Sequence, residues 1–104
     1  MTATLDPDPA PTRWAGATDA AVLQALAERD EDAARELHRR YARVIYALAF
    51  RAGAINSDVD VQRAFVAMAR HAEQRAQSRL DARLWILGTA YQALFVLPRA
   101  EKRF

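Results

Sequence analysis

Residues 57–72 read SDVDVQRAFVAMARHA, and this stretch decides the fold that the rest of the chain must match. Its apolar residues recur at intervals of four, three and four: Val61, Phe65, Met68 and Ala72. This spacing puts them on one face of an α-helix. Gln62 falls beside the apolar face, next to Asp58, where a binding partner can reach it. The stretch therefore predicts an amphipathic helix with one buried and one accessible side.

Two more helices are predicted before this stretch. Thr18 is a good N-cap for a helix that ends near Arg29, and Asp30 caps the next helix, which Gly53 ends. The apolar residues expected in their buried faces are Val22, Leu23, Leu26 and Ala27, then Leu37, Tyr41, Val44, Ile45, Leu48 and Ala49. The arginines expected on the other side of the second helix are Arg35, Arg39, Arg40 and Arg43.

The quoted helix is capped by Asn56 or Ser57 and fades over residues 73–77. A fourth helix is predicted after it. Ser78 with Asp81 resembles a capping box at the start of the fourth helix. Its expected apolar positions are Leu80, Leu84, Leu87, Tyr91, Leu94 and Phe95, widened by Trp85 and Ile86. No segment alternates apolar and polar residues as a half-buried strand does. The sequence thus predicts an all-α protein, a compact bundle of four helices joined by short loops.

The two ends of the chain differ from its middle. Residues 1–17 are acidic and proline-rich and are expected to form a flexible tail, residues 18–97 the helical domain, and residues 98–104 a basic tail. Trp14 either folds back onto the bundle or anchors a partner. The N-terminus lacks the order of a signal peptide, and no apolar run reaches the ~18 residues that span a bilayer. We therefore expect a cytoplasmic protein without a membrane partner.

Signals of catalysis are nearly absent from the sequence. The chain has no cysteine and only three glycines, which excludes disulfides, thiolate metal sites and a glycine-rich phosphate loop. His38 and His71 lie on separate helices, and the acidic residues gather at helix starts, where capping explains them. We expect no enzyme activity, no cofactor and no metal site.

The charge is unevenly distributed, although the net charge is only +2. By count of Arg and Lys against Asp and Glu, residues 1–32 have a net charge of −5, whereas residues 33–56 and 75–104 each have +4. The two basic segments either follow a phosphate backbone or are simply solvated. Core packing is the expected role of most aromatic residues: Tyr41, Phe65, Trp85, Tyr91 and Phe95. A base-stacking platform needs exposed aromatic rings beside basic residues, for which Trp85, Tyr46 and Tyr91 are the candidates.

The order of the motifs resembles region two of bacterial sigma factors of the extracytoplasmic-function type. The runs that carry the resemblance are LHRRYARVIYALAFRAG, then NSDVDVQRAFVAMARHAE, then a polar linker and ARLWILGTAYQAL. The residues that match the family's three patterns are Leu37, Arg40 and Tyr41, then Gln62 and Phe65, then Trp85, Ile86, Gly88 and Ala90. The resemblance covers about residues 18–100, most of the chain.

The resemblance implies two binding surfaces. In that family the second helix of the motif set docks on the clamp coiled coil of the largest subunit of core RNA polymerase, which implies a polymerase- or partner-binding role for Asp58, Asp60, Gln62 and Arg63. The later helix and the loop before it hold the melted minus-ten strand of promoter DNA. This implies that the linker, residues 74–81, faces DNA, with nucleic-acid-binding roles for Arg79, Arg83, Gln92 and Arg99.

Several departures from the family pattern leave other functions open. Val59 stands where the family has an acid, and Arg63 reverses a charge at a position that meets basic residues of the clamp, which weakens such an interface. The helix that faces DNA ends in an apolar run, residues 94–97, and region four is not found in the 104 residues. One alternative is a protein-interaction module that forms a homodimer or binds a sigma factor, an anti-sigma factor or another regulatory protein. Another is an unrelated helical bundle whose motifs match by chance.

Overall fold

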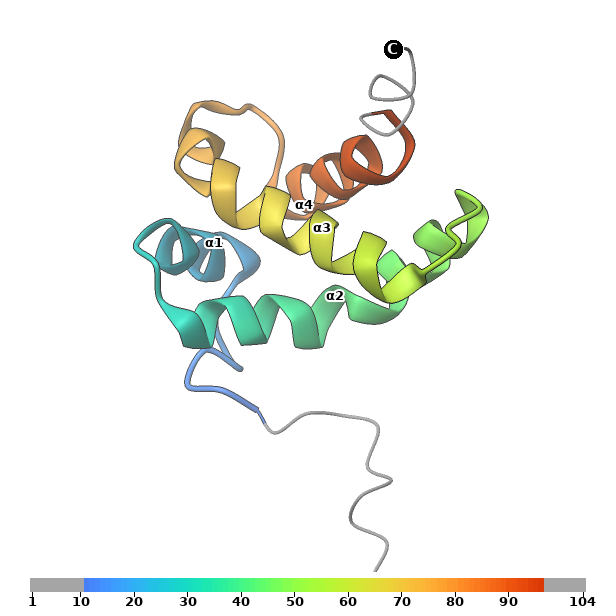
Figure 1. The fold of residues 1–104 in the computed structure, drawn as a ribbon. Coiled ribbons are helices and arrows are strands. Elements are labelled where there is room, and N and C mark those ends of the chain that lie inside the picture. Colours follow the sequence, from blue (N-terminus) through green and yellow to red (C-terminus); the bar gives the residue numbers. More distant parts are fainter. Residues whose placement is uncertain (1–10, 97–104) are drawn as a thin grey trace, which may run out of the picture.

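The fold is known from a computed structural model, which describes residues 11–96 (Figure 1). This part of the chain is all-α, as predicted, and contains no strand. Its helices are α1 (Asp19–Ala27), α2 (Glu31–Arg51), α3 (Ser57–His71), the 3-10 helix η2 (Ala72–Gln77), α4 (Ala82–Tyr91) and the π-helix η3 (Gln92–Val96), which directly continues α4.

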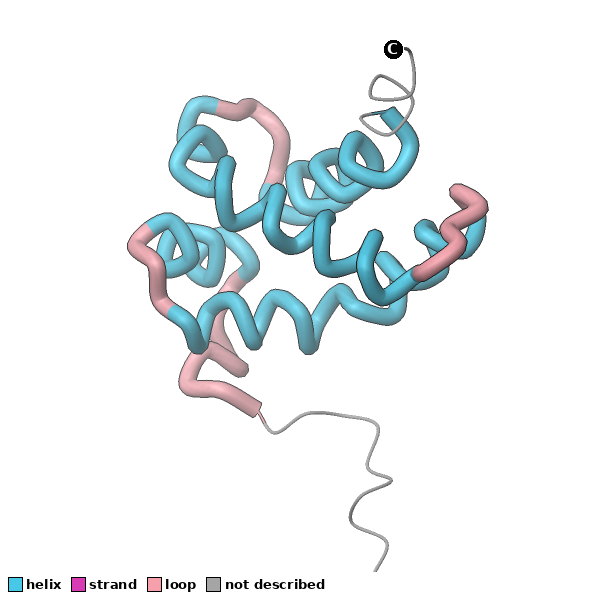
Figure 2. The backbone as a smooth tube through the Cα atoms, in the orientation of Figure 1, coloured by secondary structure: helices cyan, strands magenta, loops and turns pink. Residues whose placement is uncertain are grey.

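The four α-helices form one bundle with α3 at its centre. α2 and α3 run in opposite directions and pack against each other, and α4 packs on α3 (Figure 1). α1 packs on α2 and on η2, so that the N-terminal part of α2 and the end of α3 are held together through α1. Short loops join the helices (Figure 2). This arrangement leaves α2 at one edge of the bundle and opens a space between α3 and α4.

The helix starts follow local capping chemistry. Asn56, not Ser57, caps α3, and its side chain accepts a hydrogen bond from the N–H of Val59. The expected capping box at Ser78 is wrong, because the side chain of Asp81 caps α4 by accepting from the N–H of Leu84. The 3-10 turn of η2 is followed by extended backbone at Ser78, which therefore lies too far before the helix to cap it.

Two helices end in the same backbone motif. After α2, the N–H of Ala54 donates to the carbonyl of Ala49 at 3.1 Å, and Gly53 between them has φ +80°. After α1, the N–H of Asp30 donates to the carbonyl of Ala25 at 3.0 Å, and Arg29 has φ +67°. Both are Schellman ends, which need a left-handed residue. Gly53 ends α2 as predicted, whereas α1 ends on a non-glycine residue in a strained conformation.

The core agrees with the apolar spacing of α1, α2 and α3, with few exceptions. The buried residues of these helices are Val22, Leu23, Ala25, Leu26, Ala33, Leu37, Tyr41, Ile45, Ala49, Val61, Ala64 and Met68. Phe65 is only partly buried, and Val44 is 41% exposed, which contradicts its expected place in the core. Glu36 is fully buried, which the spacing did not indicate.

The buried face of α4 is rotated from the expected one. Leu80, Leu84 and Tyr91 are half-exposed, so their prediction as core residues is wrong. Trp85, Ile86 and Leu94 are buried as predicted, and Ala82 and Ala90, which were not predicted, face the core beside them. Small alanine side chains let α4 approach the bundle closely, whereas large leucines on the flank remain in solvent. The exposed ring of Tyr91 stacks on Phe95 with 4.6 Å between the ring centroids.

Residues 12–17, which were expected to belong to a flexible tail, contact α2. The hydroxyl of Thr12 donates to the buried carboxylate of Glu36 at 2.8 Å, and Trp14 packs against the core. Of the two roles considered for Trp14, the structure therefore shows the packed one. Nη2 of Arg40 donates to the carbonyls of three residues of this segment: Trp14, Ala15 and Ala17. The expected tails lie partly outside the described residues, at 1–10 and 97–104.

Candidate functional site

The outward side of α3 presents Gln62 and Asp58, which are both exposed. Asp58 accepts a hydrogen bond from the hydroxyl of Tyr46 on α2. This bond raises the pKa of Tyr46, because a phenolate there would face a carboxylate. Asp58 is therefore fixed at the edge between α2 and α3, and Gln62 lies one turn further along, open to a partner.

Asp60 and Arg63 lie on a different side of α3. Nη2 of Arg63 and Oδ1 of Asp60 are 3.6 Å apart, and 45% and 29% of the two side chains are exposed, so the pair contributes little stability. Ala67 and His71 continue this row at four-residue intervals, and both line a pocket between α3 and α4. The four residues predicted to bind a partner are thus divided between two sides of one helix.

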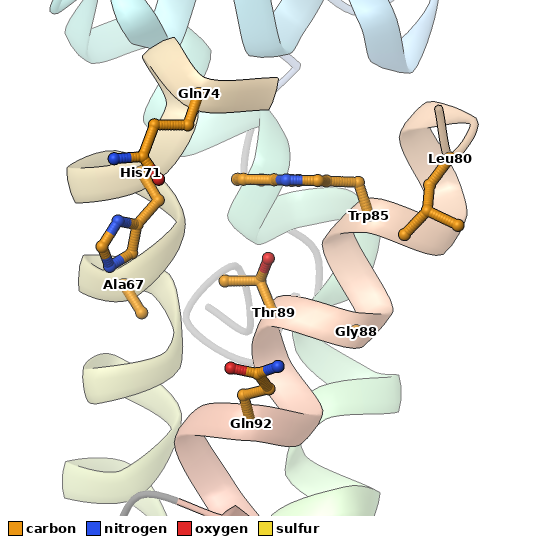
Figure 3. A pocket seen from close by; sticks show the side chains of 8 residues that line it. All are labelled: Ala67, His71, Gln74, Leu80, Trp85, Gly88, Thr89 and Gln92. Carbon is orange, nitrogen blue, oxygen red and sulfur yellow. The ribbon is translucent and has the colours of Figure 1, made fainter. Parts of the chain in front are cut away.

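The space between α3 and α4 forms a pocket of about 370 Å³. Its lining residues are Ala67, His71, Gln74, Leu80, Trp85, Gly88, Thr89 and Gln92. Figure 3 shows the indole of Trp85 extending from α4 across the pocket toward Gln74, with Thr89 and Gln92 below it on the same helix. A Cβ atom added to Gly88 would meet no atom within 4 Å, so this glycine leaves part of the pocket open.

The pocket combines apolar surface with polar groups at its rim. Trp85 is 9% exposed, so only a small part of its indole is open to the pocket. The amides of Gln74 and Gln92 and the hydroxyl of Thr89 supply both hydrogen-bond donors and acceptors. Such a combination suits a planar heterocycle, which binds through its apolar face and through polar atoms at its edge.

The residues predicted to bind nucleic acid are not gathered at this pocket. Gln92 lines it. Arg83 lies nine positions earlier, about half a turn away around α4, and its guanidinium carbon is 5.7 Å from the centroid of the Tyr41 ring on α2. Arg79 is exposed in the loop before α4. Arg99 lies outside the described residues.

Part of this pocket was not predicted from the sequence. Neither His71 nor Thr89, which both line it, was among the predicted binding residues. The available signal was the spacing of Trp85, Thr89 and Gln92, which recur at intervals of four and three and so share one side of a helix.

The residues of the first motif have a structural role in this chain. The carboxylate of Glu36 accepts from Arg39 at 2.6 Å and from Nε of Arg40 at 2.6 Å, and the bond from Arg39 lowers the pKa of Glu36 to about 2. Arg40 also donates to Asp19 on α1 at 2.9 Å. The hydroxyl of Tyr41 donates to the same Asp19, and burial raises the pKa of Tyr41 to about 12. Arg40 and Tyr41 thus hold α1 on α2 and are not presented to a partner.

No protein-family model, no curated protein and no solved structure matches the chain. Among the residues that the structure describes, no cluster of three or more histidine, aspartate or glutamate side chains is placed to hold a metal ion. In the same part of the chain, no helix combines the length and the apolar character needed to cross a bilayer. The predicted site residues that the structure describes thus lie on the outward side of α3, in and around the pocket between α3 and α4, and in the loop before α4.

Proposed function

We propose that this protein is a sigma-factor-like transcription protein. The outward side of α3 binds core RNA polymerase, and the pocket between α3 and α4 receives a base of the melted minus-ten promoter strand. The observation that carries the proposal is the exposed position of Gln62 beside Asp58 on α3. The resemblance implies that this helix docks on the clamp coiled coil, and a glutamine buried in the core would have left no surface for it.

The geometry of the pocket supports the second half of the proposal. Gln74 and Leu80 come from the linker, and Trp85 and Gln92 come from α4 and its continuation. These are the two segments that the resemblance implies for the melted strand. A base that has left its duplex is recognised by apolar contacts to its ring and by hydrogen bonds to its edge, which the exposed part of the indole and two amides provide.

Binding to immobilised core RNA polymerase tests the first half. Gln62→Ala is expected to weaken binding about five- to tenfold, the effect of losing an interfacial hydrogen bond worth roughly 1–1.4 kcal/mol. Gln24→Ala makes the same chemical change at an exposed site on α1 and is expected to bind like the parent chain. Equal binding of the parent and Gln62→Ala proteins, or no binding at low salt, would overturn the polymerase assignment.

Binding of the polymerase complex to single-stranded promoter DNA tests the second half. Gln92→Ala is expected to weaken this binding without changing the affinity for polymerase. Gln24→Ala is again the matched control, because Gln24 is exposed on α1 and lies outside both the linker and the pocket. If both variants bind DNA equally well, the pocket does not receive a base.

A second candidate function is a protein-interaction module without promoter recognition. Val59 and Val66 flank Gln62 at intervals of three and four and are 52% and 47% exposed, so the outward side of α3 is more apolar and less acidic than the family pattern. Such a surface suits a second copy of the chain, a sigma factor or an anti-sigma factor. In the apolar run at 94–97, Leu94 is buried in the chain's own core and is not open to a partner, whereas Val96 is 47% exposed.

The oligomeric state, measured by light scattering after size-exclusion chromatography, separates the two candidates. A stable dimer that Val66→Glu converts to monomer, together with no affinity for polymerase, would favour the interaction module. A monomer that binds polymerase through Gln62 would exclude it.

A further inference from the structure

The outward side of α2 carries a row of arginine and aromatic residues that the proposed function does not use. The members of this Arg-aromatic row follow one another at intervals of four, four, three and four: Arg35, Arg39, Arg43, Tyr46 and Phe50. Residues so spaced share one helix face, and the row extends over about 22 Å of helix axis. Within residues 11–96, α2 lies at an edge of the bundle (Figure 1), and four of the five side chains of the row are exposed.

The aromatic residues of the row are exposed to an unusual degree. Phe50 is 79% exposed and Tyr46 is 36% exposed, so the core does not account for either ring. The side chain of Arg35 is 68% exposed and that of Arg39 is 31% exposed. Arg43 is exposed as well. Rings and guanidinium groups therefore face solvent on the same side of one helix.

Hydrogen bonds hold several members of the row in place. Arg35 donates to Asp32 at 2.7 Å and Arg39 donates to Glu36 at 2.6 and 3.1 Å, each about one turn earlier on α2. A guanidinium has five N–H groups, so the bond to Asp32 leaves donors of Arg35 for a ligand. The bond from Tyr46 to Asp58 likewise fixes the tyrosine ring. The row is pre-organised, which lowers the entropy cost of binding.

We propose that the Arg-aromatic row binds single-stranded nucleic acid. The arginines contact the phosphates, and bases stack on Tyr46 and Phe50, a combination that binds single strands with little sequence preference. The carboxylate of Asp58 lies beside Tyr46 and repels phosphates, which keeps the backbone of the strand on the side of the arginines. This surface lies on a different helix from the pocket between α3 and α4, and the proposal stands whether or not the chain binds polymerase.

Fluorescence anisotropy with labelled oligothymidylate, oligouridylate and a duplex of equal length tests the proposal. Both single strands are expected to bind with similar affinity and more tightly than the duplex, because duplex bases are not free to stack on the row. Three phosphate contacts predict a slope of roughly −2 for the logarithm of affinity against the logarithm of salt concentration. A tenfold or larger preference for one of the two single strands would contradict a row that reads only phosphates and base faces.

Substitutions at two positions of the row separate stacking from simple charge. Phe50→Leu keeps an apolar side chain without a π-face and is expected to weaken binding at least about fivefold, whereas Phe50→Trp is expected to retain it. Arg43→Gln is expected to reduce the salt slope by about 0.7. These side chains are exposed, so circular dichroism is expected to show an unchanged helical fold.

The controls are exposed residues outside the row. Ile55→Ala removes a fully exposed apolar side chain close to Phe50 in sequence, and Arg70→Gln removes an exposed arginine on α3. Both are expected to bind the single strands within about twofold of the parent chain, in the range of surface changes that touch no ligand. If Ile55→Ala weakens binding as much as Phe50→Leu, the surface is an apolar docking site for a protein and the nucleic-acid proposal is wrong. Absence of binding at about 50 mM salt would also overturn it.

Discussion

Glu36 and Arg40 lie one turn apart on α2 and form an ion pair in which the carboxylate is fully buried and the arginine 17% exposed, with 2.6 Å between Nε of the arginine and Oε2 of the carboxylate. Glu36 also accepts from Thr12, and Arg40 donates to Asp19 on α1. The pair therefore connects α2 with α1 and with the segment before α1. A charge removed from water needs such partners, because an unpaired buried carboxylate is strongly destabilising.

Removing the carboxylate is expected to cost a large part of the stability. Glu36→Ala leaves Arg40 and Arg39 without their common acceptor, and breaking a buried pair in this way costs about 3–5 kcal/mol. Urea unfolding followed by circular dichroism measures the change. Glu73→Ala removes an exposed glutamate and is expected to change the free energy of unfolding by less than about 0.5 kcal/mol. Similar losses for the two variants would show that the cluster does not stabilise the fold.

Stability is expected to fall in acid because of the same carboxylate. The pKa of Glu36 is about 2 in the folded chain, against an ordinary value of 4.5. A lowered pKa stabilises the fold above the ordinary value, and this contribution is lost as the pH falls from about 4.5 to about 2, where the unfolded chain takes up the proton first. The loss is on the order of 3 kcal/mol. Unfolding free energies measured across this range should decrease less steeply in Glu36→Gln; equal slopes would contradict the assignment.

Exchanging the left-handed residues of the two Schellman ends is expected to have opposite effects on the free energy of unfolding. Arg29→Gly relieves strain of roughly 1–2 kcal/mol but increases the entropy of the unfolded chain, so we expect a net gain of about 0.5–1 kcal/mol. Gly53→Arg introduces the same strain after α2 and is expected to destabilise by about 1 kcal/mol or more. Thermal unfolding of the two variants checks the pair. A loss of stability in Arg29→Gly would mean that the arginine side chain makes a compensating contact.

Gly88 offers a test that separates stability from binding at the pocket. It lies inside α4, where glycine costs about 0.5–1 kcal/mol relative to alanine, and an added Cβ meets no atom within 4 Å. Gly88→Ala is therefore expected to raise the free energy of unfolding by that amount. Gly88→Val projects further into the pocket and is expected to weaken capture of a base while the fold remains intact. Unchanged DNA binding in Gly88→Val would argue against the pocket as the site.

Much of the fold could be predicted because local chemistry decided it. α2 begins after Asp30 and ends before Gly53, as the sequence indicated, and the apolar spacing of α3 identified its buried face. Glu36 could not be predicted as buried, because its partner Thr12, 24 residues earlier in the chain, is brought to it only by tertiary structure. The face of α4 was misassigned for a related reason: large leucines suggested the core, whereas the close approach of Ala82 and its neighbours decided which side packs.

The candidate site was predictable to a smaller extent. The exposure of Gln62 followed from its place beside the buried stripe. The pocket did not follow, because residues 72–77 form a 3-10 helix, whose turn of about three residues changes the direction of Gln74 from that in an α-helix. The rotation of α4 then decided that Gln92 faces the pocket while Arg83 faces α2.

The bonds from Arg40 to the carbonyls of Trp14, Ala15 and Ala17 have a practical consequence for work with shortened versions of the protein. A polypeptide that begins at Thr18, the first helix cap, would lack the three carbonyls that accept hydrogen bonds from Arg40, whose side chain is only 17% exposed. Such a version should express poorly or melt early, and its failure would be mistaken for a loss of function. Recombinant variants should therefore keep every residue from Thr12 onward.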